Sequence, residues 1–395
     1  MKNNLEFKTE NGKLIVCLIG HIDSNNAVEV EQKIMENMDA NPDVPVILDC
    51  AKLEYISSAG LRVVLKVSKR CAETEIINVS SEVYEIFDMT GFTQMLNVKK
   101  AFKTISVKGC EVIGQGANGK VYRIDPETIV KVFTDEDALQ DIERERELAR
   151  TAFVLGIPTA ISYDVVKIEG GGYGSVYELL KASNFAGLII NKEKSLDEVV
   201  KMSIDLLKLI HSKEVDPNSM PSMKERALDW VNFLKDYLPA DQHKKLESLV
   251  SSVPEDNHML HGDYHLRNIM YQDGEALLID MDTICHGNPI FELAFIFNAY
   301  RGFSDVGHEH AASFMGLPYE TMVEIWRKSL SLYLGTEDKA RLDDVEKKAM
   351  VIGYARILRR EIRRNGLDSE DGKKVVAKAK QFLADLIPAV DTLTF

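Results

Sequence analysis

The stretch best suited to chemistry is residues 261–268, which reads His-Gly-Asp-Tyr-His-Leu-Arg-Asn, followed by Asp280 twelve residues after Asn268. Residues 276–279 are apolar and predict a buried strand that ends at Asp280. A loop carrying Asp263 and Asn268 and a hairpin carrying Asp280 would bring three oxygen-bearing side chains together. Phosphoryl transfer from MgATP needs such a set, because one carboxylate accepts the hydroxyl proton while an Asn and an Asp hold Mg²⁺. Taken alone, these residues also fit a polar turn and a strand-end cap.

A glycine-rich segment lies upstream, at residues 112–122. Its pattern alone fits a dinucleotide turn, a kinase loop or a flexible hairpin. A dinucleotide fingerprint must open a helix, whereas here a strand-like run, a turn and a second strand follow, with Lys131 at the centre of the second strand. This order is typical of kinases. We therefore expect Gly114, Gly116 and Gly119 to cover the phosphates of ATP and Lys131 to bind the α- and β-phosphates.

The next segments predict the remaining parts of a nucleotide site. Residues 137–155 predict a charged helix, and Glu145 is the expected partner of Lys131, because an unpaired buried ammonium is costly. Glu147 is the alternative partner. Glu178 to Leu180, at the end of a further strand, would form a hinge whose main-chain groups bind adenine. Beyond Ser195 the chain is mostly helical.

Bulk properties exclude several classes of protein. The 395 residues suffice for two or three domains, and the net charge of −14 argues against binding nucleic acid through a general basic face. The N-terminus lacks a signal peptide, and no apolar run approaches the roughly 18 residues that span a bilayer. The five cysteines form no CxxC pair, which favours a reducing compartment. We expect a cytoplasmic protein that does not bind membranes.

The first hundred residues predict a small α/β domain. Asn11-Gly12 lies between two strand-like runs and predicts a hairpin, and strands then alternate with helices. Residues 55–61 join a strand to a helix, with Ser57 or Ser58 at its start. A serine there is either a cap worth about 1 kcal/mol or a phosphorylation site, since a phosphate would meet unpaired N–H groups. Residues 97–110 predict the end of this domain and a linker.

Three segments of this region resemble the STAS domain of bacterial anti-sigma-factor antagonists: residues 20–23, 55–61 and 87–92. The resemblance covers about residues 1–105. In that family a serine in the middle motif is phosphorylated by a partner kinase, which switches binding to an anti-sigma factor. The matching position is Ser58, and Asp23 matches a nearby acidic residue. The sequence has Ser57 where the family often has Asp, so a binding module that never switches is the alternative.

Residues 109–395 resemble the aminoglycoside phosphotransferase/choline kinase family, the small-molecule branch of the protein-kinase-like fold. The resemblance rests on residues 261–268, on 279–282 and on 287–294, where Glu292 replaces the usual Asp. It implies Asp263 as catalytic base, Asn268 and Asp280 as Mg²⁺ ligands, and structural roles for His261 and His265 in the catalytic loop. It also marks Asp282 as a further metal contact.

A row of arginines near the C-terminus adds one more feature. The five lie three or four residues apart on one face of a predicted helix, at Arg356, Arg359, Arg360, Arg363 and Arg364. A solvated face is the simpler interpretation. Docking of an acidic partner, or of the N-terminal domain, is the alternative.

The sequence thus predicts an α/β STAS domain with a mixed sheet and helices (1–105), followed by a bilobal α+β phosphotransferase with a small lobe (106–180) and a mostly helical large lobe (181–395). Three functions are left open. The first is an ATP- and Mg²⁺-dependent kinase acting on a hydroxyl of a small molecule, with the STAS domain as regulator. The second is a kinase that phosphorylates a STAS serine, its own Ser58 or a partner's, in an anti-sigma-type switch. The third is a module that only senses nucleotide.

Overall fold

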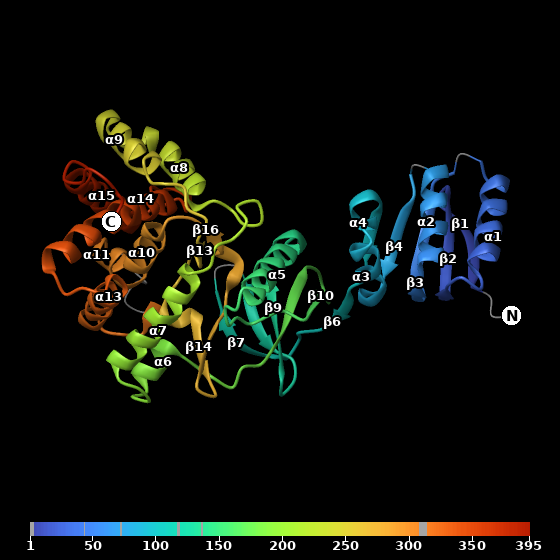
Figure 1. Ribbon diagram of the computed structural model, residues 1–395, viewed down its shortest axis with the longest axis horizontal. Coiled ribbons are helices and arrows are strands. Elements are labelled where there is room, and N and C mark those ends of the chain that lie inside the picture. The colour runs from blue at the N-terminus through green and yellow to red at the C-terminus, as the bar shows by residue number, and fades with distance from the viewer. Residues whose placement is uncertain (1–3, 43, 72, 117–118, 136, 308–313) are drawn as a thin grey trace. The chain divides into compact units, whose positions relative to one another are not determined.

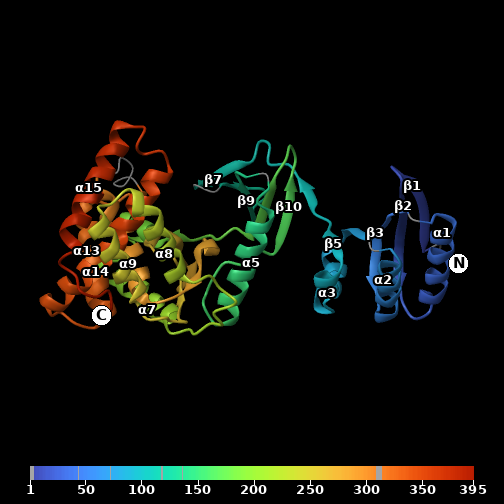
Figure 2. The same cartoon turned by 90° about the horizontal axis from the view of Figure 1, so that it is seen from above.

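The computed structural model describes residues 4–42, 44–71, 73–116, 119–135, 137–307 and 314–395. The chain forms two compact units (Figures 1 and 2). The first unit runs to Gly109 and includes Val165–Gly174, and the second contains Cys110–Asp164 and Ser175–Phe395.

The first unit is built on a five-stranded mixed sheet in the order β1-β2-β3-β4-β5. Strands β1 and β2 form the expected hairpin, in which Asn11 and Gly12 adopt positive φ angles of 50° and 73°. The other neighbours are parallel. Since each crossover moves one strand along the sheet in the same direction and right-handed crossovers dominate, the connecting helices fall on one face (Figure 2). The elements are β1 (Leu5–Glu10), β2 (Lys13–Ile22), α1 (Ala27–Ala40), β3 (Val46–Ile56), α2 (Ser58–Arg70), β4 (Glu75–Val79), α3 (Ser81–Met89), α4 (Phe92–Met95) and β5 (Asn97–Lys100).

The segment 97–110, predicted to be the end of the first domain and a linker, contains more regular structure than expected. It contains β5 and a second short strand, β6 (Lys103–Ile105), which pairs in parallel with β10 (Asp164–Ile168). Val98 is the only apolar residue of β5 and Ile105 the only one of β6. The alternating apolar pattern from which a strand is predicted is therefore missing.

A second sheet has six strands in the order β6-β10-β11-β9-β8-β7. Strands β7, β8 and β9 form an antiparallel meander that places Lys131 opposite Val121. Helix α5 follows β9 and buries Ile142, Glu145 and Leu148 on one face. The bounds are β7 (Glu111–Gln115), β8 (Gly119–Arg123), β9 (Thr128–Phe133), α5 (Leu139–Val154) and β11 (Tyr173–Glu178).

The rest of the second unit is mainly helical and surrounds a large apolar core. Helix α10 (Pro289–Phe297) lies inside it, with every residue from Ile290 onward buried. Two small sheets interrupt the helices: β12-β14-β15 and β13-β16. The helices are α6 (Phe185–Ile190), α7 (Leu196–His211), α8 (Met223–Phe233), α9 (Ala240–Ser251), α11 (Phe303–Asp305), α13 (Tyr319–Leu334), α14 (Lys339–Arg363) and α15 (Glu370–Leu386), with short turns η1 (Leu234–Asp236), η2 (Leu266–Asn268), η3 (Met281–Thr283) and η4 (Asn298–Gly302). The strands are β12 (Ser183–Asn184), β13 (Met259–Leu260), β14 (Ile269–Gln272), β15 (Glu275–Leu278) and β16 (Cys285–His286).

These elements confirm an α/β domain followed by a kinase-like α+β fold. Among the described helices, none combines the length and the apolar character that a bilayer span requires.

Candidate active site

The catalytic segment is enclosed at its base by a short ladder. Strand β13 leads into residues 261–268, β16 follows η3, and Leu260 pairs with Cys285. Gly262 has a φ of 82°, and a Cβ there would lie 2.4 Å from the carbonyl oxygen of Thr283. The Thr283 hydroxyl donates to the carbonyl of His261 at 2.8 Å. Only glycine therefore lets the Asp263 loop lie so close to the segment that carries Asp280.

A buried carboxylate supports the same loop from below. Glu292 on α10 is fully buried and accepts hydrogen bonds from the backbone N–H groups of His261 and Gly262. Burial alone would raise the pKa of Glu292, but the nearby His211 and the donated N–H groups outweigh it and lower the pKa. The glutamate that replaces the usual Asp thus orients the backbone immediately before Asp263.

Asp263 is half-exposed, and its Oδ2 lies 3.6 Å from Nε2 of the buried His265. Its backbone N–H donates to Nδ1 of His261 at 3.3 Å. Burial opposes ionisation of Asp263, but His265 and the positive charge of Arg356 outweigh burial and lower its pKa to about 2. The side chain is therefore an ionised acceptor at neutral pH.

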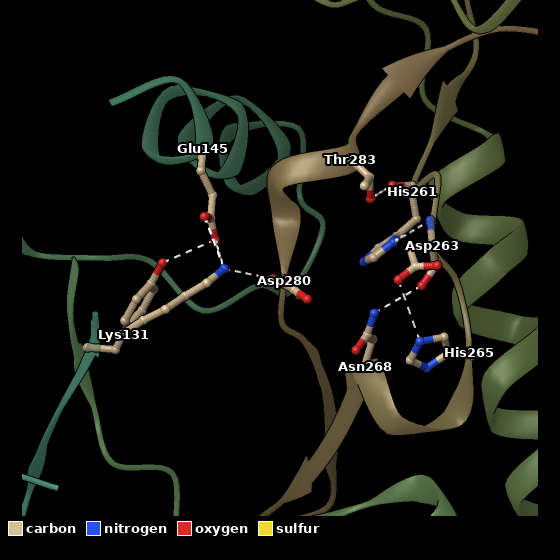
Figure 3. A network of polar contacts seen from close by, with 9 residues as sticks. Lys131, Glu145, His261, Asp263, His265, Asn268, Asp280 and Thr283 are labelled. Carbon is tan, nitrogen blue, oxygen red and sulfur yellow. Dashed lines mark hydrogen bonds and ion pairs between the residues drawn. The ribbon is translucent and has the colours of Figure 1, made fainter. Parts of the chain in front are cut away.

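Asn268 and Asp280 both lie near this loop (Figure 3). Asn268 donates through Nδ2 to the backbone carbonyl of Asp263 at 3.0 Å. The amide oxygen of Asn268 therefore points away from that carbonyl. The backbone carbonyl of Asn268 accepts from Ile279 at 3.0 Å, which places Asp280 next to it. Asp280 has a φ of 63° and a ψ of 64°, an uncommon conformation for a residue with a side chain. Its carboxylate is 45% exposed.

Lys131 is the centre of an ionic cluster between β9 and α5. Its Nζ lies 3.1 Å from both carboxylate oxygens of Glu145 and 2.8 Å from Oδ1 of Asp280 (Figure 3). The hydroxyl of Tyr177 donates to Glu145 at 3.3 Å. Burial disfavours the ammonium, but attraction by Glu145 and Asp280 outweighs it and raises the pKa of Lys131. Lys131 therefore remains a fixed cation, and Glu147 has no part in this cluster.

The glycine loop and the hinge have distinct local constraints. A Cβ on Gly119 would lie 2.1 Å from the carbonyl of Val132, so the pairing of β8 with β9 requires glycine there. Gly116 has open space around it, whereas Gly114 lies against Val121, and the positions 117–118 lie outside the described residues.

At the predicted hinge, the backbone N–H of Leu179 donates to the carbonyl of Glu127 at 2.7 Å. In an extended chain the backbone groups of successive residues point to opposite sides, so those of Glu178 and Leu180 point away from Glu127.

Asp282 lies behind the ionic cluster. It lines, with Glu145 and Phe133, a cavity of about 510 Å³. Burial and the charge of Asp280 raise the pKa of Asp282 to about 7.

In the first unit, Ser57 and Ser58 have different surroundings, and the sequence left two roles open for them: helix cap and phosphorylation site. Ser57 is the N-cap of α2 and accepts from the backbone N–H of Ala59 at 3.2 Å. Ser58 is exposed at the first position of the helix, and its hydroxyl has no hydrogen-bond partner within the described part of the chain.

Sequence reasoning missed two supporting residues, Tyr177 and Thr283, and considered Arg356 only as part of a helical stripe. It also gave Glu292 no role, although a single carboxylate in the apolar run 289–297 signals a buried partner. The arginine stripe is not a solvated face along its whole length, since Arg356, Arg359 and Arg360 are partly buried and stack on aromatic rings. Only Arg363 and Arg364 are exposed.

Comparison with known proteins assigns two parts of the chain to known families. Residues 109–315, more than half of the chain, match the phosphotransferase enzyme family, and residues 4–106 match the STAS domain. The N-terminal part is 36% identical over 104 residues to BtrV of Bordetella bronchiseptica, whose name describes a candidate anti-sigma factor antagonist. That match covers 24% of this chain and 89% of BtrV.

One solved structure shows the same fold for the larger part. A ternary complex of a thermostable aminoglycoside phosphotransferase APH(4)-Ia with AMP-PNP and hygromycin B has a TM-score of 0.50 and 12% identity, covering 70% of this chain and 93% of that one. The gentamicin complex of APH(2'')-IIa has a TM-score of 0.45 and 15% identity, covering 76% of this chain and 95% of that one.

The fold and the family match over residues 109–315 define a kinase-like phosphotransferase. The chain belongs to the phosphotransferase enzyme family, and its N-terminal region belongs to the STAS domain family.

Proposed function

We propose that the chain transfers the γ-phosphoryl group of ATP to a hydroxyl of a small molecule, and that the STAS domain regulates this reaction. The observation that carries the proposal is the arrangement of Lys131, clamped by Glu145 and Asp280, beside a loop that presents the ionised Asp263. A nucleotide-sensing module would need the lysine but would not need a positioned carboxylate with its own histidine support.

The donor set fits Mg²⁺. The ion prefers hard oxygen ligands from one or two carboxylates, completed by water and substrate phosphates. The carboxylate of Asp280 and the amide oxygen of Asn268 are such ligands, while Nδ2 of Asn268 is already used by the Asp263 carbonyl. When bound there, Mg²⁺ would neutralise charge on the transferring phosphoryl group. In the described part of the chain no cluster of three His, Cys, Asp or Glu could form a separate all-protein metal site.

In the proposed reaction, Asp263 accepts a hydrogen bond from the acceptor hydroxyl and aligns its oxygen with the γ-phosphorus. A bond forms between this oxygen and phosphorus, and the bond from phosphorus to the bridging β,γ-oxygen breaks, so that ADP leaves with the electron pair. The hydroxyl proton passes to Asp263. Since the pKa of Asp263 is about 2, its ground state is a weak base, and its main contribution is orientation until the proton becomes acidic late in the transfer.

The test is nucleotide turnover. The full-length chain with MgATP should bind nucleotide, and Lys131→Met should weaken that binding. ADP release in the presence of hydroxyl compounds should require Asp263. Tight ATP binding with no turnover in either the wild type or Asp263→Asn, across alcohols of all charge types, would favour the sensing module.

A second candidate is phosphorylation of a STAS serine, favoured by the exposed and unpaired hydroxyl of Ser58. Intact mass after incubation with MgATP alone decides it. A gain of one phosphate that is lost in both Ser58→Ala and Asp263→Ala would make Ser58 the acceptor. No gain, with ATP still bound, would contradict self-phosphorylation.

A further inference from the structure

A cationic group on α14, near the loop that carries Asp263, consists of Arg356, Arg359 and Arg360. Their guanidinium carbons lie over aromatic rings: Arg356 is 4.0 Å from the centre of Phe295, and Arg360 is 4.9 Å from that of Phe303. Arg359 lies 5.8 Å from the ring centre of Trp230. A guanidinium group that lies over a ring can still donate hydrogen bonds to an acceptor through its N–H groups.

Within the described ranges of the chain, the N–H groups of these arginines have no protein acceptor. Among the described residues, no carboxylate lies within 4.0 Å of the three guanidinium groups, and none of them donates a hydrogen bond. Their nitrogens are also not sealed from solvent. Holding three guanidinium groups together in this way is unfavourable, because like charges repel and burial disfavours charge. An anionic ligand would compensate for both costs.

The position of the group links it to the acceptor side of the reaction. Phe295 lies three residues after Glu292, on the same helix whose carboxylate holds the backbone of His261 and Gly262. Arg356 and Arg360 both interact electrostatically with Asp263, and Arg226 on α8 donates to the carbonyl of Thr283 at 3.5 Å. Arg356 and Arg360 thus act on the carboxylate that would receive the hydroxyl proton.

Four acidic groups act on the three arginines. Asp229 acts on Arg359, Glu361 and Asp263 act on Arg360, and Asp263 and Glu292 act on Arg356. Glu292 already binds two backbone N–H groups, and Asp229 is exposed. A polycationic acceptor would be repelled here, whereas an anion of two charges would match the three free guanidinium edges.

Resting on the proposed function, we propose that the acceptor is an alcohol that also carries a phosphomonoester, which binds the N–H edges of Arg356, Arg359 and Arg360. The anionic group would anchor the molecule while its hydroxyl faces Asp263.

Binding of inorganic phosphate to the full-length chain tests this proposal. Mg²⁺ and saturating AMP-PNP occupy the nucleotide site, and phosphate is titrated by calorimetry. We expect saturable binding of one phosphate, weakened at least about tenfold in Arg356→Gln/Arg360→Gln, since charge-assisted hydrogen bonds of this kind are among the strong ones. Arg356→Lys should retain part of the binding. Arg364→Gln, an exposed arginine of the same helix, is the matched control and should bind like the wild type.

The opposite outcomes are equally clear. Absence of saturable binding, or binding that the double variant leaves unchanged while it still binds AMP-PNP and melts like the wild type, would overturn the proposal. Acetate binding as tightly as phosphate would overturn the phosphomonoester class in favour of carboxylates, and displacement of phosphate by equimolar kanamycin would overturn an anion-specific site. Asp263→Asn should still bind phosphate. Absence of turnover in the wild type, with phosphate binding intact, would reject the proposed reaction and leave the anion site standing.

Discussion

The hydroxyl of Ser58 and the carboxylate of Asp263 are positioned by different means. Ser58 stands at the start of α2 because the backbone turns there, with Ser57 as cap and Gly60 packed tightly against Ile22 and Ile56. Asp263 is positioned by side chains from distant segments, including Glu292 on α10 and Thr283 after η3. A site of the first kind depends on local sterics, and one of the second kind depends on the tertiary fold.

This difference predicts how each site fails. Substitutions in the phosphotransferase site should lower the activity or break an ion pair of the second unit, and should change the STAS domain little. Substitutions at the start of α2 should act mainly on the stability of the STAS domain. The following experiments test that division, from the largest expected effect to the smallest.

Asp263→Asn should lower the turnover number by about 10²–10⁴-fold, the usual contribution of a positioned base. The amide keeps the shape of the side chain but loses the charge that orients the hydroxyl. Steady-state kinetics with any accepted alcohol would measure it, with unchanged AMP-PNP affinity as the check on folding. Asp273→Asn, in the exposed β14–β15 turn, is the matched control. Equal loss in both variants would point to general damage to the fold.

Glu145→Ala should destabilise the second unit by about 3–5 kcal/mol, because removal of one partner leaves the buried Lys131 with only the half-exposed Asp280. Denaturant unfolding followed by the fluorescence of Trp230 and Trp326 would report it. The double variant Lys131→Met/Glu145→Leu should recover most of that stability while remaining unable to bind ATP. A double variant as unstable as the single one would show that packing, and not the unpaired charge, causes the loss.

Gly60→Ala should destabilise the STAS domain by about 1–3 kcal/mol, since overpacking costs this much. The new Cβ would lie 2.6 Å from Cγ1 of Ile56 and 2.9 Å from the carbonyl oxygen of Ile22, which cannot move away as a side chain can. Hydrogen exchange of α2 and β2 in the full chain would detect the change. ATP binding should be unaffected, and a coupled loss of ATP affinity would show that α2 also supports the nucleotide site.

Ser57→Ala should cost about 1 kcal/mol, the usual value of an N-cap. Its neighbour offers the control: Ser58→Ala removes an exposed hydroxyl without a partner and should change stability by less than about 0.5 kcal/mol. Faster exchange at the start of α2 in the first variant only would support the assignment of Ser57 as cap. Equal effects would mean that both hydroxyls stabilise the helix.

The sequence was informative where the physics is local or where burial demands a partner. The Asn11-Gly12 hairpin follows from the φ angles that these residues tolerate, and the pairing of Lys131 with Glu145 follows from the cost of a lone buried ammonium. The roles of Glu292 and Arg356 could not be predicted in the same way. Each depends on how α10 and α14 pack in the core, and a helical stripe of arginines looks the same whether it faces water or the rings of Phe295 and Phe303.

The ladder between β13 and β16 has a consequence for motion. It encloses residues 261–284 in one closed loop, within which Asn268 bonds Ile279 and Thr283 bonds His261. Local opening of a protein proceeds in contiguous cooperative units, so this loop should open and close as a whole. Asp263 and Asp280, seventeen positions apart in the chain, would then take up and leave their positions together. A state with only one of the two carboxylates in place would not persist, and so could not hydrolyse ATP with water.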